Sequence, residues 1–217
     1  MNQFYTDSFL FFLHMNVPNK LTLSRLILTP VAFFLFILSS RNHYLITNIT
    51  VKAIFSVLVL LIMIYMELSD LIDGKIARRY HLVTDLGKVF DPFSDMFMHL
   101  SMFFAFVTSS YMSFVVFIIC LWRELIMLLM RNLLASRNVS FPANIFGKSK
   151  TMLFAIITFL TLIYNILLDF VKVNTTLVTF GKVIYWIGFL AAFASLMSLI
   201  IYLYNIRKSH ILNSITK

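Results

Sequence analysis

Long apolar stretches alternate with short polar segments along the whole chain. Each stretch comes close to or exceeds the roughly 20 residues that an α-helix needs to cross a bilayer. The polar segments between them hold turn and interface residues, such as Arg41 to His43, Ser109-Ser110 and Asn174 to Thr176. The pattern predicts six spanning helices with no long soluble domain between them. They are expected at residues 23–40, 53–72, 92–109, 112–135, 150–171 and 182–206.

The composition also indicates a membrane protein. Hydrophobic residues make up 60% of the chain and charged residues 12%, and the mean hydropathy is +0.91, far from the balance of soluble domains. A net charge of +9 on so apolar a chain suits anionic lipid or a phosphorylated ligand better than nucleic acid. The single cysteine, Cys120, can form no intrachain disulfide, and the chain has no Cys/His cluster for zinc. Any metal must therefore bind to oxygen.

Basic residues collect on one side of the predicted bundle. The opposite side has only Arg41, Lys52, Lys172 and Lys182. Because basic residues concentrate in cytoplasmic loops, both termini are expected in the cytoplasm, as in a protein of the inner (cytoplasmic) membrane. The residues on the basic side are Lys20, Arg25, Lys75, Arg78, Arg79, Lys88, Arg131, Arg137, Lys148, Lys150, Arg207, Lys208 and Lys217.

The first residues predict an interfacial helix rather than a removable signal peptide. Residues 1–14 carry four phenylalanines but no basic n-region and no small-residue cleavage site. Translation from Met15 is the alternative. The expected fold is an all-α integral membrane protein, a six-transmembrane-helix bundle with an N-terminal interfacial segment at 1–22 and a membrane domain at 23–217. No internal repeat of fixed period is evident, so the sequence gives alternating-access transport no support.

Acidic residues cluster in one 29-residue window at the cytoplasmic junction of the second and third predicted spans. Carboxylates at membrane depth are costly and repel one another unless a cation neutralises them. Asp70 and Asp73 are three residues apart and Asp91 and Asp95 four apart, so each pair projects from one face of a helix. Four facing carboxylates without His or Cys suit two Mg²⁺ or Mn²⁺ ions, a site typical of phosphoryl transfer. The acids in the window are Glu67, Asp70, Asp73, Asp85, Asp91 and Asp95.

Small residues and an arginine lie among these acids. Gly74, Ala77 and Gly87 would let a ligand or a backbone approach closely. Arg78 could contact a phosphate oxygen with its fork of donors. Taken one at a time, the glycines could serve helix packing, and Arg78 could serve as a positive-inside anchor.

Together, residues 70–95 read D-x2-D-G-x2-A-R-x8-G-x3-D-x3-D. This pattern resembles the signature of the CDP-alcohol phosphatidyltransferase family, which it matches at all eight positions. With average residue usage of about one in twenty, a chance match in a chain this long is on the order of 10⁻⁸.

The resemblance implies a site for a CDP-linked lipid. In that family, four aspartates in a six-helix bundle that opens to the cytoplasm hold two divalent ions, which bind the diphosphate of the donor. Asp70, Asp73, Asp91 and Asp95 would be the metal ligands, and Asp95 would also accept the proton of the attacking hydroxyl. Homodimers are expected from the same resemblance. The residues that would bind the CDP-lipid are Asn19, Thr22, Gly74, Ala77, Arg78 and Gly87.

Softer motifs resemble the branch of the family that makes phosphatidylglycerophosphate from CDP-diacylglycerol and glycerol 3-phosphate. That branch usually has a lysine after the fourth aspartate and an alanine before it, where this chain has Met96 and Ser94. The departure weakens the assignment of the acceptor, not that of the fold. The motifs are Pro18 to Arg25, Asp91-Pro92, Arg123 to Leu125 and Gly147 to Thr151.

An anionic acceptor needs cations beside the metal site. The candidates are Arg123, Arg131, Lys148 and Lys150, near the cytoplasmic ends of the fourth and fifth predicted spans. Arg123 lies inside an apolar run, where a charge is expensive unless it faces a polar cavity or a partner. For Lys148 and Lys150, plain topology determination is the alternative.

The leading hypothesis is an enzyme that releases CMP, with CDP-diacylglycerol, glycerol 3-phosphate and membrane lipid as its partners. Met96 supports an alternative in which the acceptor is inositol phosphate, serine or another alcohol. A divalent-cation transporter would instead need acids near the bilayer midplane and a path onward, whereas all four aspartates lie beside the basic loop. An inactive scaffold fits poorly because all eight signature positions remain.

Overall fold

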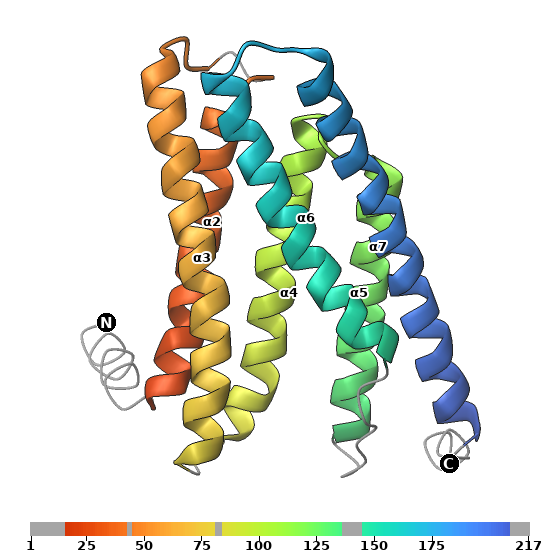
Figure 1. Ribbon diagram of the computed structural model, residues 1–217. Helices are drawn as coiled ribbons and strands as arrows, with labels where there is room; N and C mark the ends of the chain where they lie inside the picture. The colour runs from red at the N-terminus through yellow and green to blue at the C-terminus, as the bar shows by residue number, and fades with distance from the viewer. Residues whose placement is uncertain (1–15, 43–44, 81–83, 136–144, 209–217) are drawn as a thin grey trace.

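The chain is described by a computed structural model that covers residues 16–42, 45–80, 84–135 and 145–208. Within these ranges the regular structure is entirely α-helical (Figure 1). Four of the helices are long and apolar enough to cross a membrane: α2, α3, α6 and α7. The described helices are α2 (Val17–Ser39), α3 (Ile49–Arg79), α4 (Asp85–Thr108), α5 (Phe114–Ala135), α6 (Ile145–Phe170) and α7 (Thr175–Lys208).

The all-helical prediction is confirmed, and each described helix overlaps one predicted span. Two boundaries differ by seven residues around the aspartates, because α3 continues to Arg79 and α4 begins at Asp85. Alanine, lysine and arginine favour the extra turns of α3. The Thr84 hydroxyl caps α4 by accepting a hydrogen bond from the Gly87 backbone N–H at 3.0 Å. The aspartates therefore lie on rigid helices rather than in a loop.

Two other boundaries bear on the prediction. The helix α7 begins at Thr175, where the Asn174 side chain accepts from the Leu177 backbone N–H at 2.8 Å, seven residues before the expected start. The predicted interfacial helix falls mainly in residues 1–15, outside the described part. The rest of that segment, from Val17 onward, forms the first turns of α2. That α4 and α5 also span the membrane stays a prediction.

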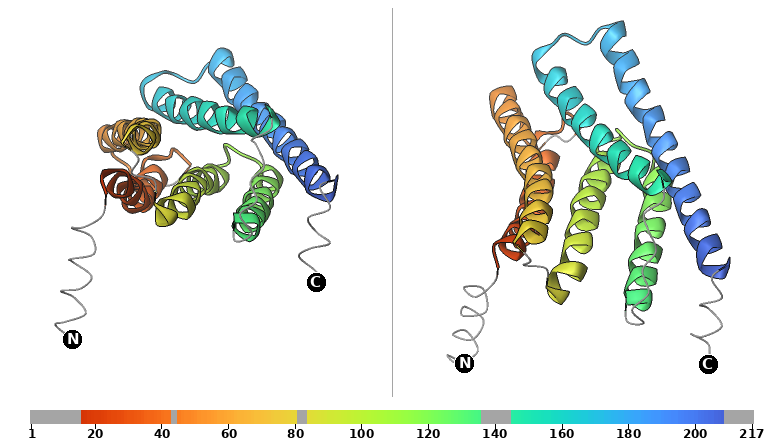
Figure 2. Two further views of the ribbon diagram at one scale, coloured as in Figure 1. Left: turned by 90° about the horizontal axis from the view of Figure 1, so that it is seen from below. Right: turned by 60° about the horizontal axis from the view of Figure 1, so that its bottom comes forward.

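The helices form two groups that meet mainly where α3 packs against α6 and α4 against α5. The first group is α2 packed against α3 and α4, and the second is α7 packed against α5 and α6. Contacts of α3 with α6, and of α4 with α5 and α6, join the groups (Figure 2). The first residues of α2 and α4 and the last residues of α3, α5 and α7 lie at one end, the bottom of Figure 1. We call it the site end, because the three aspartates described below lie there.

The face that α2 turns to the interior is polar at the site end. Its buried residues recur at helical spacing, and the first half of the stripe includes Asn19, Thr22, Arg25 and Thr29. The opposite face exposes large apolar side chains, among them Ile27 and Phe34, which suits contact with lipid. The helix is thus apolar outside and polar inside, the arrangement expected where a polar site is enclosed within a membrane.

A buried asparagine ties the helices together at the other end. The Asn165 amide of α6 donates to the Ser56 hydroxyl at 2.9 Å and to the Ser39 hydroxyl at 3.4 Å. Its carbonyl oxygen accepts from the Tyr111 hydroxyl at 2.9 Å. One side chain therefore links α2, α3, α6 and the turn between α4 and α5.

Replacing Asn165 with leucine should lower the apparent Tm of the detergent-purified protein. The change leaves three hydroxyls without their amide partner, a loss of roughly 1–3 kcal/mol. Thr158→Val is the matched control, because Thr158 is also fully buried on α6 and its hydroxyl has no partner among the described residues. Equal thermal stability of the two variants would contradict the proposed role of Asn165.

Candidate active site

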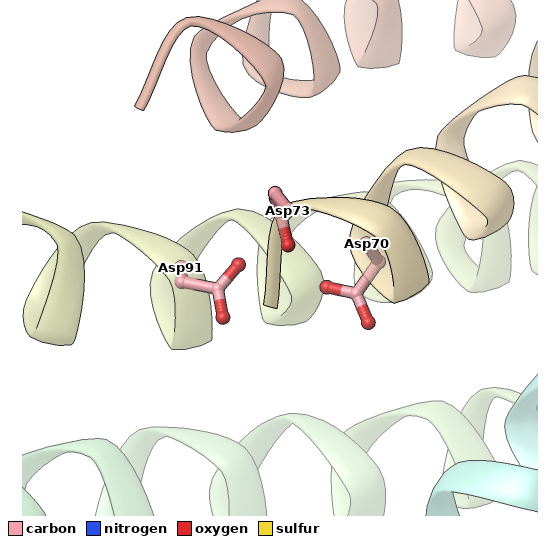
Figure 3. A group of neighbouring side chains, drawn as sticks. All are labelled: Asp70, Asp73 and Asp91. Atoms are coloured by element: carbon pink, nitrogen blue, oxygen red, sulfur yellow. The ribbon is translucent and has the colours of Figure 1, made fainter. Parts of the chain in front are cut away.

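Three aspartates direct their carboxylates into one space at the site end (Figure 3). Asp70 and Asp73 lie near the end of α3, and Asp91 lies in the second turn of α4. One oxygen from each carboxylate is within 4.8 Å of the other two. Asp73 is buried, whereas Asp70 and Asp91 are partly exposed. Helical spacing alone predicts the pairing of Asp70 with Asp73, and the packing of the helices adds Asp91.

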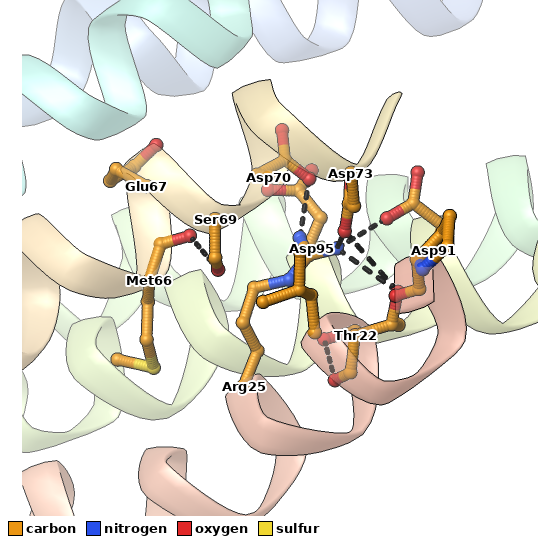
Figure 4. A network of polar contacts seen from close by, with 12 residues as sticks. Thr22, Arg25, Met66, Glu67, Ser69, Asp70, Asp73, Asp91 and Asp95 are labelled. Carbon is orange, nitrogen blue, oxygen red and sulfur yellow. Dashed lines mark hydrogen bonds and ion pairs between the residues drawn. The ribbon is translucent and has the colours of Figure 1, made fainter. Parts of the chain in front are cut away.

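The side chain of Arg25, from α2, lies among these carboxylates (Figure 4). Its guanidinium is fully buried and forms ion pairs with all three aspartates, including a contact of 2.6 Å to Asp73 Oδ2. The Thr22 hydroxyl donates to the same Asp73 oxygen at 3.3 Å. A buried guanidinium is expensive without partners, and three carboxylates are expensive without a cation. The carboxylates therefore offset the cost of burying the guanidinium, and the guanidinium reduces the repulsion among the carboxylates.

The three aspartates fit a divalent cation. Their donors are all carboxylate oxygens, the ligands that Mg²⁺ and Mn²⁺ prefer, and they face a space where a cationic group already sits. Three ionised carboxylates and one guanidinium leave two negative charges uncompensated. No second group of this kind occurs among the described residues. The identity of the ion, and the presence of two ions, stay predictions.

Asp95 lies one turn beyond Asp91 on α4 and outside the group of three. Its Oδ1 is 3.3 Å from Nε2 of His99. The structure thus brings together three of the four predicted metal ligands and turns the fourth carboxylate toward a histidine. The proposed roles of Asp95 as a metal ligand and as the base stay predictions.

The residues predicted to bind the CDP-lipid lie where α2, α3 and α4 meet. The Asn19 amide donates to the Thr84 hydroxyl at 3.2 Å. A Cβ atom at Gly87 would approach Asn19 Oδ1 to 3.0 Å, so the absence of a side chain lets α2 approach α4 here. Gly74 and Ala77 are partly buried on α3. The side chain of Arg78 lies outside the described part of the structure.

Comparison with known proteins identifies the family. Residues 15–194 match the family model for CDP-alcohol phosphatidyltransferase, which is most of the chain. The chain belongs to the CDP-alcohol phosphatidyltransferase family.

Several relatives carry the name CDP-diacylglycerol–glycerol-3-phosphate 3-phosphatidyltransferase. The protein from Rickettsia typhi is 31% identical over 138 residues, which cover 64% of this chain and 71% of the relative. The protein from Aquifex aeolicus is 30% identical over 140 residues, 64% and 70% of the two chains. The protein from Bacillus subtilis is 28% identical over 161 residues, 72% and 81% of the two chains.

In this CDP-alcohol phosphatidyltransferase, two of the residues predicted for the acceptor share one buried carboxylate. Arg123 donates to Glu124 Oε1 at 2.9 Å and to the Ser198 hydroxyl at 2.8 Å. Lys150 donates to the same Glu124 oxygen at 2.7 Å, and its ammonium lies 4.5 Å from the centre of the Phe154 ring. All three charged residues are buried, so they form an ionic cluster that joins α5, α6 and α7.

The other two predicted acceptor residues do not join this cluster in the described structure. Arg131 is exposed on α5. The side chain of Lys148 lies outside the described part. Of the four cations that the sequence predicts for the acceptor pocket, the structure brings together Arg123 and Lys150.

Both departures from the family branch lie at buried positions. Met96 is buried in the main hydrophobic cluster, so this position faces the core of the bundle. Ser94 is fully buried and donates to the Thr22 backbone carbonyl at 3.3 Å, joining α4 to α2. Neither substitution disturbs the grouping of the three aspartates.

Sequence reasoning missed Arg25 and His99. The sequence places Arg25 among the basic residues that set topology and at the end of the Pro18 to Arg25 motif, but assigns it no role at the metal site, although it lies one helical turn from Thr22 inside an apolar span. No motif of the sequence points to His99, although it follows Asp95 by four residues and so shares its face of the helix. In both cases the only signal in the sequence is helical spacing, from Thr22 to Arg25 and from Asp95 to His99. What spacing cannot supply is the packing of α2 against α3 and α4, which turns Arg25 toward the acids.

Replacing Arg25 with glutamine should destabilise the metal-free protein, because the three carboxylates lose their buried counter-charge. In EDTA, we expect a lower apparent Tm than in wild type, and Mn²⁺ should raise the Tm of the variant by more than it raises that of wild type. Arg25→Lys, which keeps the charge but not the fork of donors, should fall between the two. A variant as stable as wild type in EDTA would show that Arg25 does not neutralise the acids.

Proposed function

We propose that this protein transfers the phosphatidyl group from CDP-diacylglycerol to glycerol 3-phosphate, giving phosphatidylglycerophosphate and CMP. The observation that carries the proposal is the group formed by Asp70, Asp73 and Asp91, because the family signature and a cation-binding arrangement coincide there. The names of the relatives support the choice of donor and acceptor. The four long apolar helices suit an enzyme whose donor and product stay in the bilayer.

The three grouped aspartates would hold the metal, with Asp95 completing a site for two ions. Bound Mg²⁺ or Mn²⁺ would offset the charge of the donor diphosphate and of the departing CMP. Thr22 supports this role, since its hydroxyl holds the Asp73 carboxylate. The nucleotide half of the donor would lie along Asn19, Gly74, Ala77, Arg78 and Gly87.

Asp95 would accept the proton of the acceptor hydroxyl. The freed oxygen then forms a bond to the phosphorus that carries diacylglycerol. The bond from that phosphorus to the bridging oxygen of the diphosphate breaks, and CMP leaves with the electron pair. No covalent enzyme intermediate is required.

The cluster of Arg123, Glu124 and Lys150 supports an anionic acceptor. Two cations share a single carboxylate, so the cluster keeps a net positive charge within the bundle. The buried Nε of Arg123 has no hydrogen-bond partner in the described structure. An unpaired buried donor is costly, and a phosphate oxygen would satisfy it. Arg131 and Lys148 would extend the pocket toward the aqueous side.

The orientation of the enzyme follows from its charges. Exposed basic residues gather at the site end, including Lys20, Lys75, Arg79, Arg131 and Arg207. Under the positive-inside rule, this end and the active site face the cytoplasm, with the enzyme in the inner membrane. The homodimer implied by the family resemblance is part of the same proposal.

Wild-type protein in detergent should release CMP from CDP-diacylglycerol when supplied with glycerol 3-phosphate and Mg²⁺ or Mn²⁺. Asp91→Asn should abolish release without loss of expression, because it removes one carboxylate of the group. Asp169→Asn is the matched control, since Asp169 lies at the opposite end of the bundle beside Ser56. Turnover by Asp91→Asn at the wild-type rate would rule out the metal-site assignment.

The same assay separates the alternatives. Inositol phosphate and serine are supplied in parallel arms. CMP release only with inositol phosphate or only with serine would support the proposed metal site but assign a different acceptor to the enzyme. No release in any arm would favour a transporter or scaffold.

Replacing Lys150 with glutamine should raise the KM for glycerol 3-phosphate by about tenfold or more, because a charged hydrogen-bond donor is lost from the pocket. The KM for CDP-diacylglycerol should change little. Arg207→Gln serves as the control, since Arg207 is an exposed cation at the end of α7. An unchanged KM for the acceptor would remove Lys150 from the acceptor pocket.

A further inference from the structure

His99 lies between two carboxylates that come from different helices. Its ring is buried on α4, and Nε2 is 3.3 Å from Asp95 Oδ1 and 3.5 Å from Glu67 Oε1. Glu67 lies on α3, one turn before Asp70. A single ring nitrogen therefore faces the carboxylate next to the three-aspartate group on one side and a deeper carboxylate on the other.

Aromatic packing fixes the plane of the ring. Phe154 of α6 meets it edge to face, with the ring centres 5.8 Å apart, and Phe103 lies 6.5 Å away. These rings leave the imidazole little freedom to turn. The same Phe154 ring carries the Lys150 ammonium on its face, so His99 also stands next to the proposed acceptor cluster.

Three buried polar atoms around His99 have no aligned hydrogen-bond partner among the described residues. Both ring nitrogens and Glu67 Oε1 are buried, yet none forms an aligned hydrogen bond within the described structure. Buried polar groups without partners are costly, and those that persist at a catalytic site often tighten when substrate binds. The three residues also do not form a second metal-binding group, which argues that His99 supports the site rather than ligating an ion.

We propose that His99 is a positioning residue for Asp95. In the proposed arrangement, Nε2–H of His99 would donate to Oδ1 of Asp95 and leave the second oxygen free for the metal, while the Glu67 carboxylate stays beside the same nitrogen and favours its protonated form. The proposal rests on the proposed function, in which Asp95 is a metal ligand and the base. Partners that orient ligands in this way typically affect metal affinity or activity by about 10–100-fold when they are removed.

The first test measures Mn²⁺ affinity by electron paramagnetic resonance on the full-length protein in detergent, without substrates. His99→Phe keeps an aromatic ring but removes the N–H, and we expect it to weaken Mn²⁺ binding by about 10–100-fold. His99→Gln retains a side-chain N–H and should recover most of the loss. Met98→Leu is the control, because Met98 is a fully buried neighbour in the hydrophobic core.

A double variant tests whether His99 acts through Asp95. If it does, His99→Phe combined with Asp95→Asn should bind Mn²⁺ no more weakly than Asp95→Asn alone. In turnover assays, His99→Phe should lower kcat while the KM for CDP-diacylglycerol stays within about twofold, the signature of a lost transition-state interaction.

Wild-type Mn²⁺ affinity in His99→Phe would overturn the proposal, whatever the turnover. Equal losses in His99→Phe and His99→Gln, with a lowered Tm in both, would overturn it in favour of a purely structural role. Failure of the proposed function is distinguishable, because the wild type would then release no CMP with any acceptor while the Mn²⁺ measurements still decide the role of His99.

Discussion

Mutual repulsion among the carboxylates at the site end is the constraint on which the arrangement of the helices there depends. Asp70, Asp73 and Asp91 can share one space only if a cation stands between them. The guanidinium of Arg25 supplies such a cation, and its three ion pairs join α2 to α3 and α4. Thr22 and Ser94 reinforce the contact of α2 with its two neighbours. A divalent ion at these carboxylates would compete with the guanidinium for the same negative charge.

The remaining ionisable groups of the interior follow the same rule of paired charge. Glu67 and Asp95 face His99, and Glu124 accepts from both Arg123 and Lys150. These clusters lie inside a bundle whose outer surface is apolar, as the exposed Ile27, Phe34 and Trp186 show. Unpaired charge is costly inside a membrane protein, yet the acidic and basic groups of these clusters do not cancel completely. The aspartate group is negative and suits a cation. The Arg123 cluster is positive and suits an anion, which matches a reaction that joins a metal-bound donor to a phosphorylated acceptor.

Much of the fold was predictable because hydrophobic length is read directly from the sequence. The six apolar stretches each coincide with a described helix, and of the four aspartates that the signature predicts as metal ligands the structure groups three. The ends of the helices were harder to predict from the sequence. The predicted span stops at residue 72, where the apolar run ends, but the polar residues from Asp73 to Arg79 continue the helix. Long-range contacts were harder still. Arg25 is 45 residues from Asp70 and 66 from Asp91, so only the packing of α2 could bring it to the site. The sequence also does not reveal that Met96 is buried in the hydrophobic cluster, which only the packing shows.

Asp70, Asp73 and Asp91 share one cation site, into which the Arg25 guanidinium reaches from α2. A crystal structure of the full-length protein grown with Mn²⁺, with the ion located by anomalous scattering, tests this site. We expect an anomalous peak between the three carboxylates, with the Arg25 guanidinium shifted away from at least one of the oxygens that it contacts here. A peak elsewhere, or no peak with Arg25 still holding all three carboxylates, would contradict this expectation.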